Sequence, residues 1–153
     1  MQTRNINYYY FKNITKPSVI QTSFSVDYDT ISFDLKSVYP TPSLLTLTRT
    51  NTYHRTPGRQ SVIIQDKVKF NSPTNYSFGI PSKNGFWTLL NASSNSLTGK
   101  FTVSRVSLNV RVNSTNSFTF DVKTKTELGL TYTRLGISMI NPIMEDLITI
   151  TFY

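Results

Sequence analysis

Cysteine is absent from these 153 residues, alanine occurs once and histidine occurs once. Without cysteine, the chain can form neither a disulfide framework nor a thiolate zinc site. The near-absence of alanine removes the residue type that favours helix most. No run approaches the roughly 18 apolar residues that a membrane helix needs, so we expect no membrane partner. No apolar segment follows Met1, so we also expect no secretory signal.

Polar β-formers and turn residues are abundant instead. The chain has 22 Thr, 18 Ser and 13 Asn, together with 10 Phe and 9 Tyr. Threonine and the aromatic residues pack well on a pleated surface, whereas Ser and Asn favour turns. The aromatic side chains are bulky enough to fill a two-layer core in a chain of this length. The composition therefore predicts an all-β protein with a single domain.

Strict alternation of apolar and polar residues recurs along the chain. In its clearest form, Val106, Leu108, Val110 and Val112 alternate with polar residues. Such alternation indicates strands with one buried and one solvated face, as in antiparallel sheets. The other alternating segments are 20–28, 31–35, 62–70, 118–122, 128–132 and 148–152.

Turn signals separate these segments and set the expected architecture. Thr56-Pro57-Gly58, Asn84-Gly85 and Asn141-Pro142 are among them, and Asn-Gly strongly favours a hairpin. Turns at this spacing predict a single-domain antiparallel β-sandwich over residues 1–153, jelly-roll-like, with eight to ten strands and almost no helix. One helical turn is expected at 142–147, with Glu145 and Asp146 as its acidic first turn.

The net charge of +8 is concentrated in the middle of the chain. Between residues 35 and 120 there are ten basic residues and a single acid, Asp66. A predicted hairpin at 44–65, with Pro57-Gly58 at its tip, contains no acid, and Arg105 and Arg111 are expected on the outward face of one strand. We therefore predict polyanion or partner contact by Arg49, Arg55, Arg59, Lys67, Lys69, Arg105 and Arg111. Ordinary solubilising charge is the alternative.

The N-terminal residues form a second candidate contact region. Tyr8, Tyr9, Tyr10 and Phe11 place aromatic side chains on both alternating faces of the chain. A strand buried on one side only does not need this pattern. Residues 1–16 are therefore interpreted either as a first strand or an arm packed over its own sandwich, or as an N-terminal arm that contacts a neighbouring subunit.

No arrangement of residues indicates catalysis. His54 has no acid near it in sequence, and neither a nucleophile elbow nor a phosphate-binding glycine loop occurs. Asp27 and Asp29 are interpreted as a polar strand end entering a turn. Trp87 is expected in the core, with a stacking platform for a sugar or base as the alternative. We expect no enzyme and no cofactor.

A short, cysteine-free, all-β chain without catalytic motifs favours a structural role. We predict a non-enzymatic subunit of a virus or bacteriophage particle, made in the host cytoplasm and found in the virion. It would form homo-oligomers through edge strands and arms, contact other virion proteins, and bind nucleic acid through the central basic region. The alternative is a small β-sandwich module that binds carbohydrate or nucleic acid.

Overall fold

The structure is a computed structural model that describes residues 17–39, 41–58, 60–82, 85–127 and 129–153. The described chain is strand and loop, apart from one 3-10 turn, η1 (Lys36–Val38). None of the described residues belongs to a helix that could cross a membrane. The strands are β1 (Ser18–Phe24), β2 (Tyr28–Asp34), β3 (Leu44–His54), β4 (Ser61–Thr74), β5 (Ser77–Ser82), β6 (Gly85–Ala92), β7 (Ser96–Val103), β8 (Val106–Ser114), β9 (Phe118–Glu127), β10 (Leu130–Met139) and β11 (Ile143–Phe152).

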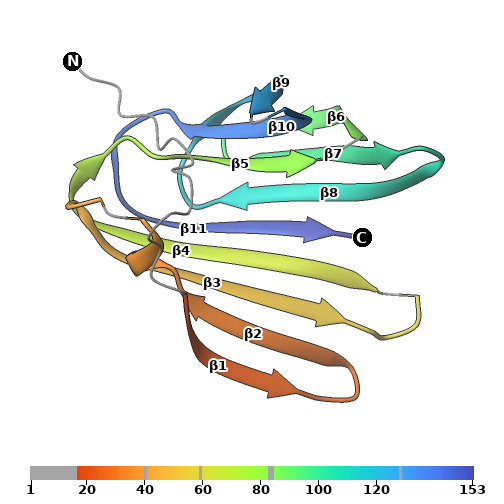
Figure 1. The fold of residues 1–153 in the computed structure, drawn as a ribbon, viewed down its shortest axis with the longest axis horizontal. Helices are drawn as coiled ribbons and strands as arrows, with labels where there is room; N and C mark the ends of the chain where they lie inside the picture. The colour runs from red at the N-terminus through yellow and green to blue at the C-terminus, as the bar shows by residue number, and fades with distance from the viewer. Residues whose placement is uncertain (1–16, 40, 59, 83–84, 128) are drawn as a thin grey trace.

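These strands form two antiparallel sheets of unequal size (Figure 1). The large sheet has the order β1-β2-β3-β4-β11-β8-β7-β6, and the small sheet has the order β5-β10-β9. The C-terminal strand β11 joins two meanders, β1 to β4 and β6 to β8, by pairing with β4 and β8. The predicted all-β antiparallel sandwich is confirmed. The eleven described strands exceed the expected eight to ten, and their division into eight and three was not predicted.

The core lies between the small sheet and the middle of the large sheet. Val68 of β4, Val112 of β8 and Ile148 of β11 are almost fully buried, and from the small sheet Leu135 and Ile137 of β10 meet them. Burying side chains of this size contributes about 1.5–3 kcal/mol each. We call the face of the large sheet that carries these core residues its inner face, and the opposite side its outer face.

The small sheet is too narrow to cover the whole inner face. Figure 1 shows β1, β2 and β3 extending beyond β4, away from the strands of the small sheet. The burial pattern agrees, because six of the seven residues of β1 are exposed. Phe24, at the end of β1, is 73% exposed. The N-terminal hairpin therefore continues the large sheet without contributing to the main core.

The predicted helical turn at 142–147 is wrong. Strand β11 begins at Ile143, and Asp146 is a buried strand residue rather than part of an acidic first helical turn. Its carboxylate accepts hydrogen bonds from Ser114 Oγ at 2.8 Å and from the backbone N–H of Thr115 at 3.0 Å. These donors come from the end of β8 and from the β8–β9 connection, so a long-range contact overrides the local preference for helix.

Candidate polyanion-binding face

The register of the strands determines which basic residues share a face. On β8, Arg111 lies between the buried Val110 and Val112 and is therefore on the outer face, opposite Thr151 of β11. On β4, Lys67 and Lys69 flank the buried Val68 and also point outward, as predicted. Alternation gives the rest of this face a threonine-rich surface: Thr48, Thr50, Thr52, Thr98, Thr149 and Thr151.

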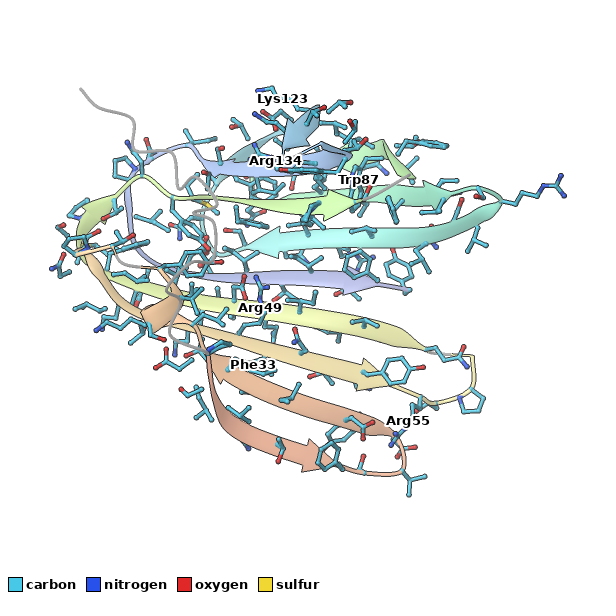
Figure 2. All side chains as sticks on the ribbon, viewed as in Figure 1. Phe33, Arg49, Arg55, Trp87, Lys123 and Arg134 are labelled. Carbon is cyan, nitrogen blue, oxygen red and sulfur yellow. The ribbon has the colours of Figure 1, made fainter. Side chains whose placement is uncertain are left out.

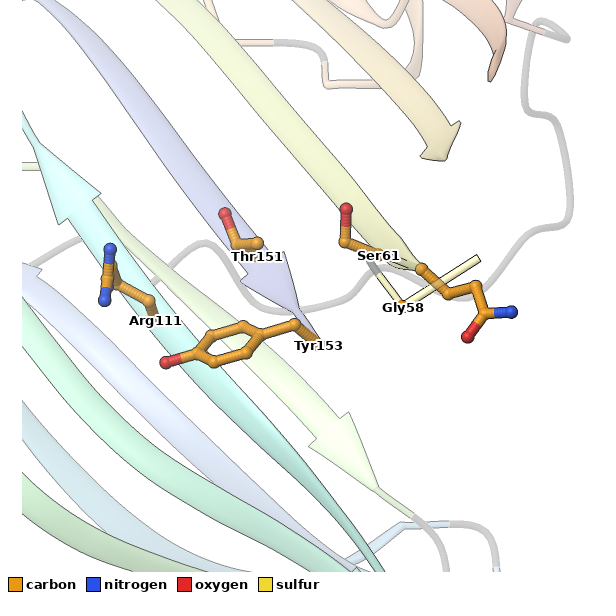
Figure 3. A pocket seen from close by; sticks show the side chains of 6 residues that line it. Gly58, Ser61, Arg111, Thr151 and Tyr153 are labelled. Atoms are coloured by element: carbon orange, nitrogen blue, oxygen red, sulfur yellow. The ribbon is translucent and has the colours of Figure 1, made fainter. Parts of the chain in front are cut away.

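A shallow depression of about 510 Å³ lies at one end of the outer face (Figure 3). The β3–β4 loop and the first residue of β4 contribute one side, and β8 and the end of β11 contribute the other. Within it, the Arg111 guanidinium carbon lies 5.8 Å from the centroid of the Tyr153 ring, a cation–π distance. The lining residues are Gly58, Gln60, Ser61, Arg111, Thr151 and Tyr153.

The lining of the depression suits an anionic ligand that also has an apolar face. None of the six lining residues is acidic, and Arg111 supplies a planar group that can donate two parallel hydrogen bonds. Tyr153 is 47% exposed, so part of its ring remains accessible for stacking. Ser61, Thr151 and Gln60 add neutral donors and acceptors. We call these six residues the Arg111–Tyr153 site.

Further cations extend the positive surface beyond this site. Lys67, Lys69 and Lys100 are exposed on the same outer face as Arg111. From the register, Lys67 lies four residues along and two strands across from Arg111, which is about 16 Å at ordinary strand spacings. Glu145, which lies opposite Lys69, is the acid nearest this row in the register. A linear polyanion could therefore contact several cations at once.

Two of the predicted contact residues are engaged by acids instead. Arg49 points to the inner face and donates from Nε and Nη2 to the two carboxylate oxygens of Asp66, at 2.7 and 2.6 Å. Hydrogen bonding to Asp66 raises the pKa of Arg49, so this guanidinium stays charged. At the end of the hairpin, Arg55 pairs with Asp29 at 2.6 Å. Figure 2 shows Arg49 within the sheet and Arg55 at the hairpin end.

The remaining predicted residues are scattered. Arg105 is exposed in the β7–β8 turn, one residue before β8 begins, rather than on the strand itself. Arg59 and the aromatic arm of Tyr8, Tyr9, Tyr10 and Phe11 lie outside the described residues. Of the seven predicted basic residues, the structure therefore places Lys67, Lys69 and Arg111 together on one face.

Trp87 and the predicted turn at Asp27 agree with the expectations from sequence. Trp87 is 8% exposed and packs against Phe101, with 4.9 Å between ring centroids, so it belongs to the core rather than to a stacking platform. Asp27 lies in the β1–β2 turn and Asp29 in β2. Within the described part of the chain, no three metal-ligand side chains come together.

Sequence reasoning missed Tyr153, Thr151, Ser61 and Gln60. The signal for Tyr153 and Thr151 was present, because alternation along the last strand places them on the face opposite Ile148 and Ile150. Ser61 and Gln60 gave no such signal. Their proximity to Arg111 depends on β11 lying between β4 and β8, and β11 pairs with these strands across separations of about 90 and 40 residues in sequence.

Comparison with known proteins shows a fold relationship only. No protein-family model matches this sequence, and no curated protein matches it. Among solved structures, the chain is similar to a heparinase III gene product (TM-score 0.58, 13% identity) and to a heparan sulfate lyase mutant from Pedobacter heparinus (TM-score 0.54, 12% identity). Each match covers 90% of this chain. The chain corresponds to only 21% of the first structure and 22% of the second.

Proposed function

We propose that this chain is a non-enzymatic β-sandwich module that binds acidic polysaccharide on the outer face of its large sheet. The observation that supports this most is the Arg111–Tyr153 site, where a guanidinium and a partly exposed aromatic ring line one depression. Aromatic rings bind the apolar faces of sugars, and guanidinium groups bind carboxylates and sulfates in bidentate geometry. An acidic sugar presents both features.

The distribution of charge supports a polymeric ligand. Lys67 and Lys69 continue the positive surface about 16 Å and about 22 Å from Arg111, farther than one sugar ring extends. The spacing of these cations suits a chain with repeated anionic groups. Because the face is flat and open, the contacts are expected to be sensitive to salt.

The fold comparison supports the same class of ligand by analogy. The similar solved structures are described as a heparinase and a heparan sulfate lyase, and heparan sulfate is an acidic polysaccharide. Since this chain spans about a fifth of those proteins, their catalytic activity is not part of the proposal. The analogy concerns a sandwich of this kind in proteins that handle acidic glycans.

Calorimetric titration with a heparin oligosaccharide tests the proposal. Arg111→Ala is expected to weaken binding at least tenfold, and Tyr153→Ala about fivefold, since a charged bidentate contact and a stacked ring are each worth about 1–3 kcal/mol. Lys123→Ala is the matched control. It removes the same charge from the small sheet, where Figure 2 places Lys123, and should leave affinity within twofold.

Three results would count against the proposal. One is the absence of heparin binding at low salt, and another is an equal loss of affinity in Arg111→Ala and Lys123→Ala, which would indicate net charge alone. The third is tighter binding of a single-stranded oligonucleotide of equal charge than of heparin. That last result would favour the alternative ligand, nucleic acid.

A second candidate function is the particle subunit predicted from sequence. The observation that favours it is the exposed β1–β2 hairpin, whose apolar side chains are left uncovered by the small sheet. A subunit of this kind should form closed or tubular assemblies at high concentration, visible by electron microscopy of the purified chain. Assemblies no larger than a dimer would contradict this candidate and leave polysaccharide binding untouched.

A further inference from the structure

In the described part of the chain, strand β1 forms an edge of the large sheet that no charged side chain, proline or neighbouring strand protects against pairing. Its seven residues, Ser18–Phe24, include no charged residue, no proline and no glycine. Among the described strands, β1 pairs only with β2 and is the first strand in the sheet order. Natural edge strands are normally blunted by lysine, proline or a covering element, because their free N–H and C=O groups attract another strand.

Both faces of this edge are also exposed. Val19 is 56% exposed, Ile20 57% and Phe24 73%. An irregularity in the register at Ile20 leaves Val19 opposite Phe33, so Val19 and Phe24 lie on the same face of the strand, the uncovered part of the inner face. A strand added beside β1 would therefore satisfy the free backbone groups and bury apolar side chains at the same time.

The three other sheet edges are better protected against a second copy. On the small sheet, β9 carries Lys123 and Lys125, and β5 carries Pro81, which cannot donate a backbone hydrogen bond. The far edge of the large sheet, β6, is uncharged, but it lies against β10 of the small sheet, which leaves less room for another strand.

The charge around β1 also differs from that of the rest of the molecule. The chain carries +8 overall, which disfavours contact between two copies in most orientations. From residue 17 to residue 34 there are three acids, Asp27, Asp29 and Asp34, and no base. Asp29 is neutralised by Arg55. A contact at β1 therefore avoids the cations of β4 and β8, which lie three or more strands away in each sheet.

We propose that the free edge of β1 pairs with β1 of a second copy, antiparallel, about a two-fold axis that joins the two large sheets. Such an axis through the middle of β1 places Phe24 of one copy beside Val19 and Ile20 of the other. The surface used is the same on both copies, as a two-fold interface requires. This inference does not depend on polysaccharide binding, since the Arg111–Tyr153 site lies on β4, β8 and β11.

Sedimentation equilibrium of the full chain tests the pairing up to about 1 mM, because an interface of one strand is small and weak. The mass should rise with concentration from the 17.5 kDa monomer towards twice that value. Thr22→Lys places a charge on the edge and should weaken the dimer at least tenfold. Thr88→Lys, on the β6 edge, is the matched control and should leave dimerisation unchanged.

Hydrogen exchange supplies a readout that does not rely on a variant. Protection of the β1 amides should increase with protein concentration in parallel with the mass, while protection of β6 stays constant. A monomer at every concentration would overturn the proposal. So would a dimer that Thr22→Lys does not weaken, or β1 amides already protected in the dilute monomer, which would mean that another segment of the same chain covers this edge.

Discussion

Arg49 and Asp66 face each other across β3 and β4 and form a bidentate ion pair on the inner face of the large sheet. Nε and Nη2 of Arg49 lie 2.7 and 2.6 Å from the two carboxylate oxygens. Asp66 is only 3% exposed, whereas the Arg49 side chain is 40% exposed. Asp66, the only acid between residues 35 and 120, is therefore paired with Arg49 on the inner face. It adds no negative charge to the outer face.

Removing Arg49 should destabilise the fold far more than removing Arg55. Arg49→Ala leaves the buried Asp66 carboxylate unpaired and is expected to cost about 3–5 kcal/mol. Arg55→Ala breaks an exposed pair with Asp29 and should cost at most about 1 kcal/mol. Urea denaturation of both variants measures the difference. Equal losses would show that the Arg49–Asp66 pair does not stabilise the structure as its burial implies.

Much of the architecture could be predicted because it depends on local pattern. Alternation such as that of Val110 and Val112 specifies strands whatever their partners, and Pro57-Gly58 lies in the connection between β3 and β4 as expected. The helical turn at 142–147 could not be excluded from sequence, because Asp146 and Pro142 match a helix start. The donors of Ser114 and Thr115, about 30 residues away, decide that segment.

The candidate site was less predictable than the fold. Lys67 and Lys69 were assigned correctly to one face, since a period of two within one strand is enough for that. Arg49, one of the predicted contact residues, lies on the inner face and pairs with Asp66, which the parity of a strand could not show because it does not say which face is covered. Tyr153 was not considered, because its contact with Arg111 depends on the pairing of β8 with β11.

The Asp146 carboxylate should contribute more to the stability of the fold than that of its neighbour Glu145. Asp146→Asn replaces an acceptor of the Ser114 and Thr115 donors by an amide that also donates, and should cost about 2–3 kcal/mol. Glu145→Gln changes an exposed residue and should lie within about 0.5 kcal/mol of the parent. Thermal unfolding compares the two. A stable Asp146→Asn protein would mean that the β8–β9 connection is held by other contacts.

Tyr76 should make the fold sensitive to alkali. Burial raises the pKa of Tyr76 above the ordinary value of about 10, since the neutral phenol is favoured in the core. The folded state thus holds this proton more tightly than the unfolded state. The resulting stability is fully present below pH of about 10 and is lost above it, at up to about 1.4 kcal/mol per pH unit.

Tyr76→Phe isolates this contribution. The variant removes the titrating group and keeps the ring that packs against Phe70 and Phe78. Stability measured by urea titration between pH 8 and pH of about 11.5 should then fall less steeply than in the parent chain. Parallel curves for the two proteins would show that Tyr76 titrates alike in the folded and unfolded states.

The length of the ligand and the salt concentration should separate the contribution of the Arg111–Tyr153 site to affinity from that of Lys67 and Lys69. A double variant, Lys67→Ala with Lys69→Ala, should weaken binding of a long heparin chain and flatten its dependence on salt, because fewer counterions are displaced. A fragment shorter than about 16 Å cannot reach from Arg111 to Lys67 and should bind both proteins alike. Equal weakening of both ligands would mean that the lysines act only through net charge.

The most direct test of the account is to map heparin oligosaccharide binding onto the backbone amides by NMR. Binding on the outer face predicts the largest shifts at Ser61, Arg111, Thr151 and Tyr153, with smaller shifts at Lys67 and Lys69. Strand β10 of the small sheet should remain unaffected. Shifts centred on the small sheet, or spread evenly over both sheets, would contradict the assignment of the outer face as the binding surface.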